Sequence, residues 1–324
     1  MRRRDVIKVA AASAVAWPLA GHAQKPAPPV IGFLHSSFRQ GYEPQVAAFL
    51  KGLGDAGFFQ DRDVSIEYRW AEGRNDRLPA LAADLVSRQV TVITAASTPA
   101  ALAAKAATTT IPIIFEGGAD PIKVGLVSRL DRPGGNITGV TQLNIEVGPK
   151  RLGLLHEMVP KASSMAFLVN PTDRTMELAD VQAVARRLGI DLHLLNASND
   201  REIESSFASL PQLRVGALAI GSSAFFVARQ EHLAALAVRG AMPAAFENRQ
   251  FVAAGGLMSY GGRLADSYYL AGVYTGRILK GEKPGELPVQ QTTKVELFIN
   301  VKSARALGLS VPPTLQARAD EMIE

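Results

Sequence analysis

Short apolar runs and amphipathic segments alternate along the chain. The runs at 90–96 and 111–115 are too short for helices and rich in β-branched residues, which predicts buried strands of a parallel sheet. Residues 44–56 carry apolar side chains at intervals of three and four, which predicts an amphipathic helix. A strand at 165–169 restarts the alternation. We therefore predict an α/β chain of two lobes, each a doubly wound parallel sheet, with a ligand cleft between them.

Two of the predicted strands end in a polar turn followed by proline. Residues 97–99 read Ser-Thr-Pro, and residues 120–121 read Asp-Pro. A capping side chain with proline in the first turn is typical of a helix start, so we expect helices at 100–107 and 122–130. The carboxyl ends of parallel strands share one edge of a sheet, where α/β proteins bind ligands, and the free amides of helix N-termini suit an anion.

The first residues predict export. Residues 1–23 combine an arginine triplet, an apolar run at 9–19 and a small-x-small site at 21–23, which is typical of a secretory signal peptide. Residues 3–8 also resemble the twin-arginine export motif, although Sec signals can carry arginines too. The chain has no cysteine, and hence neither disulfides nor a cysteine for a lipid anchor. We expect a soluble periplasmic protein.

Charge argues against nucleic acid as a partner. The net charge of the 324 residues is +5, but residues 1–23 hold four basic residues and one acidic residue, so the remaining chain has a net charge of +2. No Lys/Arg cluster interleaved with aromatic residues occurs there. Beyond residue 23 no apolar span has the length of a membrane helix.

Motifs for catalysis are weak. Cysteine nucleophiles are excluded, and the four histidines after residue 23 show no metal-ligand spacing. The sequence contains no nucleophile elbow, no dinucleotide-binding fingerprint and no Walker A phosphate-binding loop. A binding site needs only a few convergent polar groups and an apolar or aromatic lining. We therefore favour a binding protein without a cofactor over an enzyme.

Several polar residues of the turns are candidate ligand contacts, although each could instead have an ordinary structural role. Ser97 and Thr98 can hold a carboxylate, or they can merely cap a helix. Asp120 has the same two readings. Glu116 can accept a hydrogen bond from an amine or hydroxyl of a ligand, or it can be a solvated carboxylate in a loop. Arg249 can pair with a carboxylate, or lie on the surface. Aromatic residues in or beside predicted loops, Tyr42, Phe246 and Tyr260 among them, favour a ring-bearing or apolar ligand if they share one cleft.

Several short sequence segments resemble those of a known protein family. They lie at residues 120–121, 125–127, 132–139, 169–171, 255–261, 276–281, 294–300 and 306–309. In combination they resemble the substrate-binding proteins of ABC transporters, in the tryptophan/tyrosine-binding-like branch, over nearly the whole chain after residue 23.

The resemblance implies a type I periplasmic-binding fold, whose two lobes are joined by three crossing segments and close on a ligand. We expect lobe 1 to hold residues 24–141 and about 260–290, and lobe 2 to hold 142–259 and about 291–324. The partners would be a permease with its ATPase subunits, and the protein would act as a monomer. The candidate ligand-binding residues are Ser36, Tyr42, Ser97, Thr98, Glu116, Asp120, Thr141, Asn170, Ser222, Phe246, Arg249 and Tyr260.

One departure from the family bears on the ligand. Many relatives have an acidic-plus-amide pair where this chain has Ser222 and Ser223. Loss of that carboxylate makes an aromatic or other organic acid at least as plausible as an amino acid. We therefore expect an importer component that captures a small carboxylate, either an aromatic acid or an aromatic or apolar amino acid. The alternatives are an enzyme on the same scaffold, with His35, Glu116 or Asp120 for acid–base work, and a ligand-sensing receptor for a membrane partner.

Overall fold

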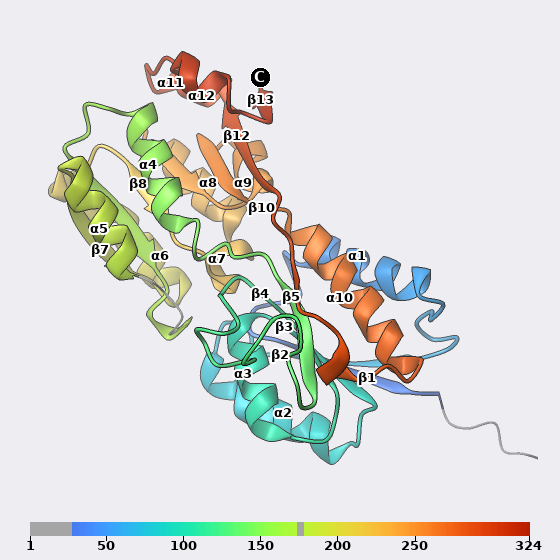
Figure 1. Cartoon of the computed structure of the whole chain (residues 1–324). Helices are drawn as coiled ribbons and strands as arrows, with labels where there is room; N and C mark the ends of the chain where they lie inside the picture. Colours follow the sequence, from blue (N-terminus) through green and yellow to red (C-terminus); the bar gives the residue numbers. More distant parts are fainter. Residues whose placement is uncertain (1–27, 174–177) are drawn as a thin grey trace, which may run out of the picture.

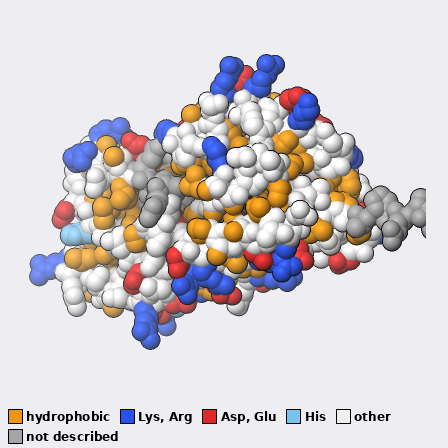
Figure 2. Space-filling view, turned by 90° about the horizontal axis from the view of Figure 1, so that it is seen from below, with side chains coloured by type: hydrophobic (Ala, Val, Ile, Leu, Met, Phe, Trp, Pro, Cys, Tyr) orange, Lys and Arg blue, Asp and Glu red, His pale blue; other side chains and the backbone are white. Residues whose placement is uncertain are grey.

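The computed structural model describes residues 28–173 and 178–324, and the predicted signal peptide at 1–23 lies outside the described residues. The chain forms two α/β lobes side by side (Figure 1). On the face shown in Figure 2, lysine and arginine side chains are spread over the surface rather than gathered in one patch.

Lobe 1 is built on a six-stranded sheet in the order β11-β5-β4-β3-β1-β2, with every pair parallel. Helices α2 and α3 cover one face, and α1 and α10 cover the other (Figure 1). The elements are β1 (Val30–His35), α1 (Glu43–Asp55), β2 (Ser65–Trp70), η1 (Asn75–Arg77), α2 (Leu78–Ser87), β3 (Val92–Ala96), α3 (Thr98–Ala107), β4 (Ile113–Gly117), β5 (Ile137–Thr141), α10 (Leu264–Leu279), η3 (Pro284–Glu286) and β11 (Gln290–Gln291).

Lobe 2 is built on a seven-stranded sheet in the order β13-β12-β10-β9-β8-β6-β7. Its pairs are parallel except for β10 and β12, which run antiparallel. The elements are α4 (Gly148–Met158), β6 (Ser164–Val169), η2 (Pro171–Asp173), α5 (Leu178–Leu188), β7 (Asp191–Asn196), α6 (Asp200–Leu213), β8 (Leu218–Ile220), α7 (Ala224–Val227), α8 (Gln230–Arg239), β9 (Ala244–Phe246), α9 (Arg249–Ala253), β10 (Met258–Gly262), β12 (Val295–Asn300), α11 (Val301–Ala306), α12 (Pro313–Gln316) and β13 (Glu321–Ile323).

The chain passes between the two sheets three times. It leaves lobe 1 after β5, returns between β10 and α10, and leaves again between β11 and β12. As a result, α10 packs against α1 of the same lobe although more than two hundred residues separate them in sequence. The carboxyl ends of β3 and β4 face those of β6, β8 and β9 across the junction, which is where a ligand site is expected in such folds.

The two predicted helix starts have different outcomes. The helix predicted at 100–107 is present as α3, which begins two residues earlier at Thr98, and the Ser97 side chain caps it by accepting a hydrogen bond from the Ala100 amide. The helix predicted at 122–130 is wrong. Asp120 Oδ1 does accept from the Ile122 amide at 2.9 Å, but only turns follow, because Gly125 takes a positive φ of 73° that a helix does not allow.

Close packing of α1 on α10 depends on glycine. A Cβ atom added at Gly272 would lie 2.1 Å from the Phe49 carbonyl oxygen. We expect Gly272→Ala to lower the free energy of unfolding by about 2–3 kcal/mol, because the two helices must separate. Urea unfolding measures the change. The matched control is Gly153→Ala in α4, where a Cβ would meet nothing within 4 Å. Its expected effect is a gain of about 0.5–1 kcal/mol from helix propensity, and a loss in both variants would contradict the explanation.

Candidate functional site

A cavity of about 60 Å³ lies between the lobes and takes its lining from both. Lobe 1 contributes the start of α3, the end of β4 and one face of α10. Lobe 2 contributes η2 and the loops after β8 and β9, and the first crossing segment contributes Gln142 and Asn144. The polar and aromatic lining residues are Tyr42, Ser97, Thr98, Glu116, Gln142, Asn144, Asp173, Ser222, Ser223, Glu247 and Tyr268.

The lobes touch across this cavity. The Tyr42 hydroxyl of lobe 1 donates to the Ala224 carbonyl oxygen of lobe 2 at 3.2 Å. At another point of the rim, the Asn75 side-chain amide of lobe 1 donates to Asp173 Oδ1 of lobe 2 at 3.1 Å. These contacts enclose the cavity, so the structure corresponds to a closed arrangement of the lobes.

Three buried carboxylates are the main charged groups of the cavity. Burial raises the pKa of Glu116 to about 8; the hydrogen bond from Ser267 opposes this rise, and the negative charge of Glu247 adds to it. Burial likewise raises the pKa of Asp173 to about 6. Burial also raises the pKa of Glu247, while Arg151 opposes that rise. At neutral pH the Glu116 carboxyl is therefore mainly protonated, whereas Asp173 is mainly ionised.

Each glutamate is held by neighbouring polar groups. Glu116 Oε1 accepts from Ser267 Oγ at 2.8 Å and from Gln142 Nε2 at 2.9 Å. Glu247 Oε2 lies 2.5 Å from Ser222 Oγ. These bonds fix both carboxylates at the cavity wall, one from each lobe.

Arg151 lies behind Glu247 and is completely buried. Its guanidinium donates to the carbonyl oxygens of Tyr260 at 3.0 Å, Ile220 at 3.1 Å and Asn144 at 3.4 Å. One guanidinium nitrogen is 4.0 Å from Glu247 Oε2. Arg151 thus links the first crossing segment, the end of β8 and strand β10 by hydrogen bonds, on the side of Glu247 that faces away from the cavity.

Two tyrosines form the aromatic wall. The rings of Tyr42 and Tyr268 have centroids 6.1 Å apart, and His35 packs edge-on against Tyr42 at 4.2 Å. The Ser37 amide donates to His35 Nδ1, so Nε2 carries the proton and donates to the Tyr268 hydroxyl at 2.8 Å. Burial lowers the pKa of His35 to about 3, which keeps the ring neutral. His35 therefore positions Tyr268 and does not line the cavity.

The structure brings five of the twelve predicted residues to the cavity: Tyr42, Ser97, Thr98, Glu116 and Ser222. Asn170 lies next to it and donates to Ser223 Oγ at 3.2 Å.

The other six predicted residues do not line this cavity. Ser36 is buried, and the hydroxyl of buried Thr141 donates to the Ala119 carbonyl oxygen. Asp120 caps its own turn, and Phe246 belongs to the core of lobe 2. Exposed Arg249 pairs with Glu321, and Tyr260 packs at the edge of a core cluster in lobe 2.

Sequence reasoning missed Asn144, Asp173, Glu247 and Tyr268. Glu247 directly follows strand β9, so the rule that singled out Glu116 at a strand end would also have found it. Its place beside Ser222 matters for the ligand. The serine pair does not leave lobe 2 without a carboxylate at the cavity, because Glu247 supplies one.

Known proteins share this architecture. A tyrosine-binding protein of Clostridioides difficile (strain R20291) is 26% identical over 264 residues, which are 81% of this chain and 75% of the relative. An ABC domain in complex with L-Trp from Streptococcus pneumonia matches with a TM-score of 0.81 and 23% identity, over 92% of this chain and 100% of that one. A conserved domain protein from Vibrio cholerae matches with the same TM-score and identity, over 91% and 100%.

None of the described helices is long and apolar enough to cross a membrane. The sequence model of the family described as ABC transporter substrate binding protein matches residues 39–323. The chain therefore belongs to the ABC transporter substrate-binding proteins, and it has the two-lobed α/β architecture of type I periplasmic-binding proteins.

Proposed function

We propose that this protein captures a small aromatic ligand in the periplasm and delivers it to an ABC importer. The observation that carries the proposal is the cavity lined by residues of both lobes, because a ligand there contacts both and so stabilises their closure. The cavity of about 60 Å³ is smaller than a ring-bearing ligand, so the lobes would hold such a ligand slightly further apart than in this structure. Tyr42 and Tyr268 supply an aromatic wall. The tyrosine-binding relative and the L-Trp-bound neighbour support the same ligand class.

Of the two ligand types expected from the sequence, the cavity favours an aromatic amino acid over an aromatic acid. An ammonium group can face Glu116 and Glu247, whereas an acid without an amino group would bring a further negative charge to three carboxylates. The ligand carboxylate would face Ser97 and Thr98 at the start of α3. Export by the signal peptide at 1–23, a permease with ATPase subunits as partner, and action as a monomer complete the proposal.

The test is isothermal titration calorimetry of the mature protein with L-Tyr, L-Trp, benzoates, aliphatic amino acids and sugars. We expect saturable one-to-one binding of an aromatic amino acid. At a hundredfold excess over its dissociation constant such a ligand stabilises the fold by about 2.7 kcal/mol, which a thermal melt detects. Recovery of the unaltered ligand would support transport. Recovery of a changed compound would instead favour an enzyme, and binding of sugars alone would refute the ligand class.

A further inference from the structure

The cavity opposes carboxylates across the two lobes. Glu116 comes from the end of β4 in lobe 1, whereas Asp173 and Glu247 come from lobe 2. All three side chains are at least nine-tenths buried. Among the described residues that line this cavity, there is no lysine, arginine or histidine. Closing the lobes therefore brings acidic groups together in a space from which water is largely excluded. Without a cation between them, these groups must either repel one another or take up protons, as the raised pKa of Glu116 indicates, and both oppose closure.

The nearest arginine among the described residues does not offset this charge. Arg151 is outside the cavity lining, its guanidinium donates to three backbone carbonyl oxygens, and it approaches Glu247 no closer than 4.0 Å. In the part of the chain that the structure describes, one buried cation thus lies near three acidic side chains, and it lies behind only Glu247. Neither Glu116 nor Asp173 has an ion-pair partner among the described residues.

The site offers little to an anion. Helix α3 begins beside the cavity, but Pro99 has no N–H to donate. The Ala100 amide donates to Ser97 Oγ, and the Ala101 amide donates to the Ser97 carbonyl oxygen. The first turn therefore presents mainly the Thr98 amide and hydroxyl to a ligand, in place of the several free donors of an ordinary helix start.

We propose that the site selects its ligand by positive charge: the ammonium group of an aromatic primary amine lies between Glu116 and Glu247 and draws the two lobes together, and a carboxylate on the ligand is dispensable. This inference rests on the proposed function and narrows its ligand class. Tyr42 and Tyr268 would contact the ring of the amine and its positive charge. The ligand cation then replaces the repulsion between the lobes with attraction.

Three compounds with the same phenol ring test the inference. Tyramine carries only the ammonium group, L-tyrosine carries both charged groups, and 3-(4-hydroxyphenyl)propionate carries only the carboxylate. Calorimetry on the mature protein measures the three dissociation constants. We expect tyramine to bind within about tenfold of L-tyrosine, and the acid to bind about a hundredfold more weakly than tyramine, because only the acid lacks a charged hydrogen-bond donor.

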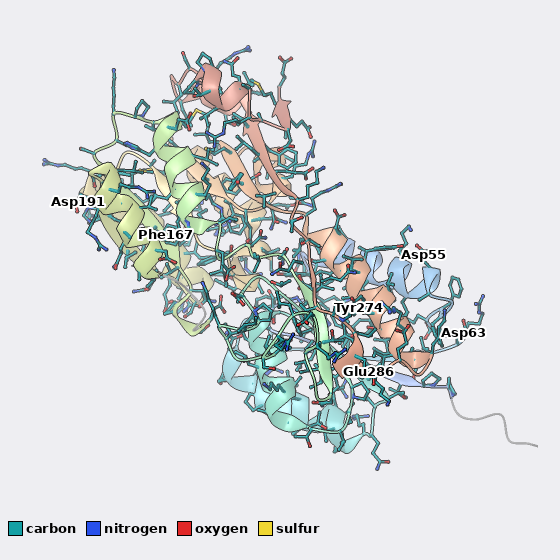
Figure 3. All side chains as sticks on the ribbon, in the orientation of Figure 1. Asp55, Asp63, Phe167, Asp191, Tyr274 and Glu286 are labelled. Carbon is teal, nitrogen blue, oxygen red and sulfur yellow. The ribbon has the colours of Figure 1, made fainter. Side chains whose placement is uncertain are left out.

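Isosteric variants test whether Glu116 and Glu247 are the groups that bind the ammonium group. Glu116→Gln and Glu247→Gln keep the shape of the site and remove one charge each, and we expect either to weaken tyramine binding about ten- to hundredfold. The matched control is Glu286→Gln on lobe 1, whose side chain is 72% exposed and lies far from lobe 2 (Figure 3). It should leave the affinity unchanged. Melting temperatures without ligand verify that each variant is folded.

The outcomes separate the inference from the proposed function. If the acid binds as tightly as tyramine, or if L-tyrosine binds and tyramine does not, selection by positive charge alone is refuted and the importer role stands. Unchanged tyramine affinity in both folded cavity variants also refutes it. If none of the three compounds binds, and their phenyl and indole counterparts do not bind either, the inference and the aromatic ligand class fall together.

Discussion

Replacing Arg151 with methionine is expected to lower the free energy of unfolding by about 3–5 kcal/mol. The substitution roughly keeps the volume of the side chain but removes its donors from three carbonyl oxygens in the interior. It also leaves buried Glu247 without the one cation that the described residues place beside it. An unpaired buried charge and unsatisfied carbonyls are both more costly than the lost hydrogen bonds themselves.

Urea unfolding of the two proteins measures this loss. Arg249→Met is the matched control, because Arg249 is 47% exposed and its partner Glu321 is 43% exposed. An exposed pair of this kind contributes about 0–1 kcal/mol. Equal losses in the two variants would mean that the carbonyl contacts of Arg151 do not hold the crossing segment and strand β10 in place.

Stability should fall as the pH rises from about 5 to about 9. The Glu116 carboxyl has a pKa near 4.5 in an unfolded chain and about 8 in the fold. Between these values the folded protein binds one more proton than the unfolded chain, so the stabilisation is complete below pH 4.5 and is lost through pH 8. Asp173 acts in the same direction at lower pH, because its pKa rises from 3.8 to about 6. For Glu116 alone the loss is about 3–5 kcal/mol.

Urea midpoints between pH 5 and pH 9 test this dependence. Glu247, which faces Glu116, and Tyr42 and Tyr268 beside it contribute to the same electrostatic environment. Glu116→Gln removes the titrating group, so most of the slope should disappear in this variant. The surface variant Glu286→Gln should keep the slope. A slope that persists in Glu116→Gln would assign the pH dependence to other groups of the cavity.

Part of the site could be predicted from the sequence, because polar residues at the carboxyl ends of parallel strands gather at one edge of the sheet. Ser97 and Thr98 follow an apolar strand of five residues, Glu116 lies at the end of another, and parallel topology brings such positions together. Glu247 follows the three-residue strand β9, and the same rule was not applied there. Tyr268 lies on α10, which reaches lobe 1 only through the second crossing. The missing information was therefore topological.

One predicted helix was wrong and one buried cation was not singled out, because a local pattern has more than one outcome. An arginine beside a lysine on an amphipathic helix resembles a surface residue, and only packing of α4 against the ends of β8 and β10 buries Arg151. The Asp-Pro pair at 120–121 did cap a turn. However, the positive φ of Gly125 and the bond from the Asp120 amide to Glu146 Oε1 hold the following chain in a different path.

The three crossings also determine when the protein can fold during synthesis. Lobe 1 requires α10 and β11, which end at residue 291, and lobe 2 requires β12 and β13, which end at residue 323. A nascent chain that has emerged only as far as residue 260 can complete neither lobe. The apolar side chains of α1 that α10 covers, such as Phe49 and Leu53, stay exposed for most of translation. The core of lobe 1 can therefore form only once residue 291 has emerged, and that of lobe 2 only once residue 323 has emerged, and until then the exposed apolar surface makes the chain a client for holding chaperones.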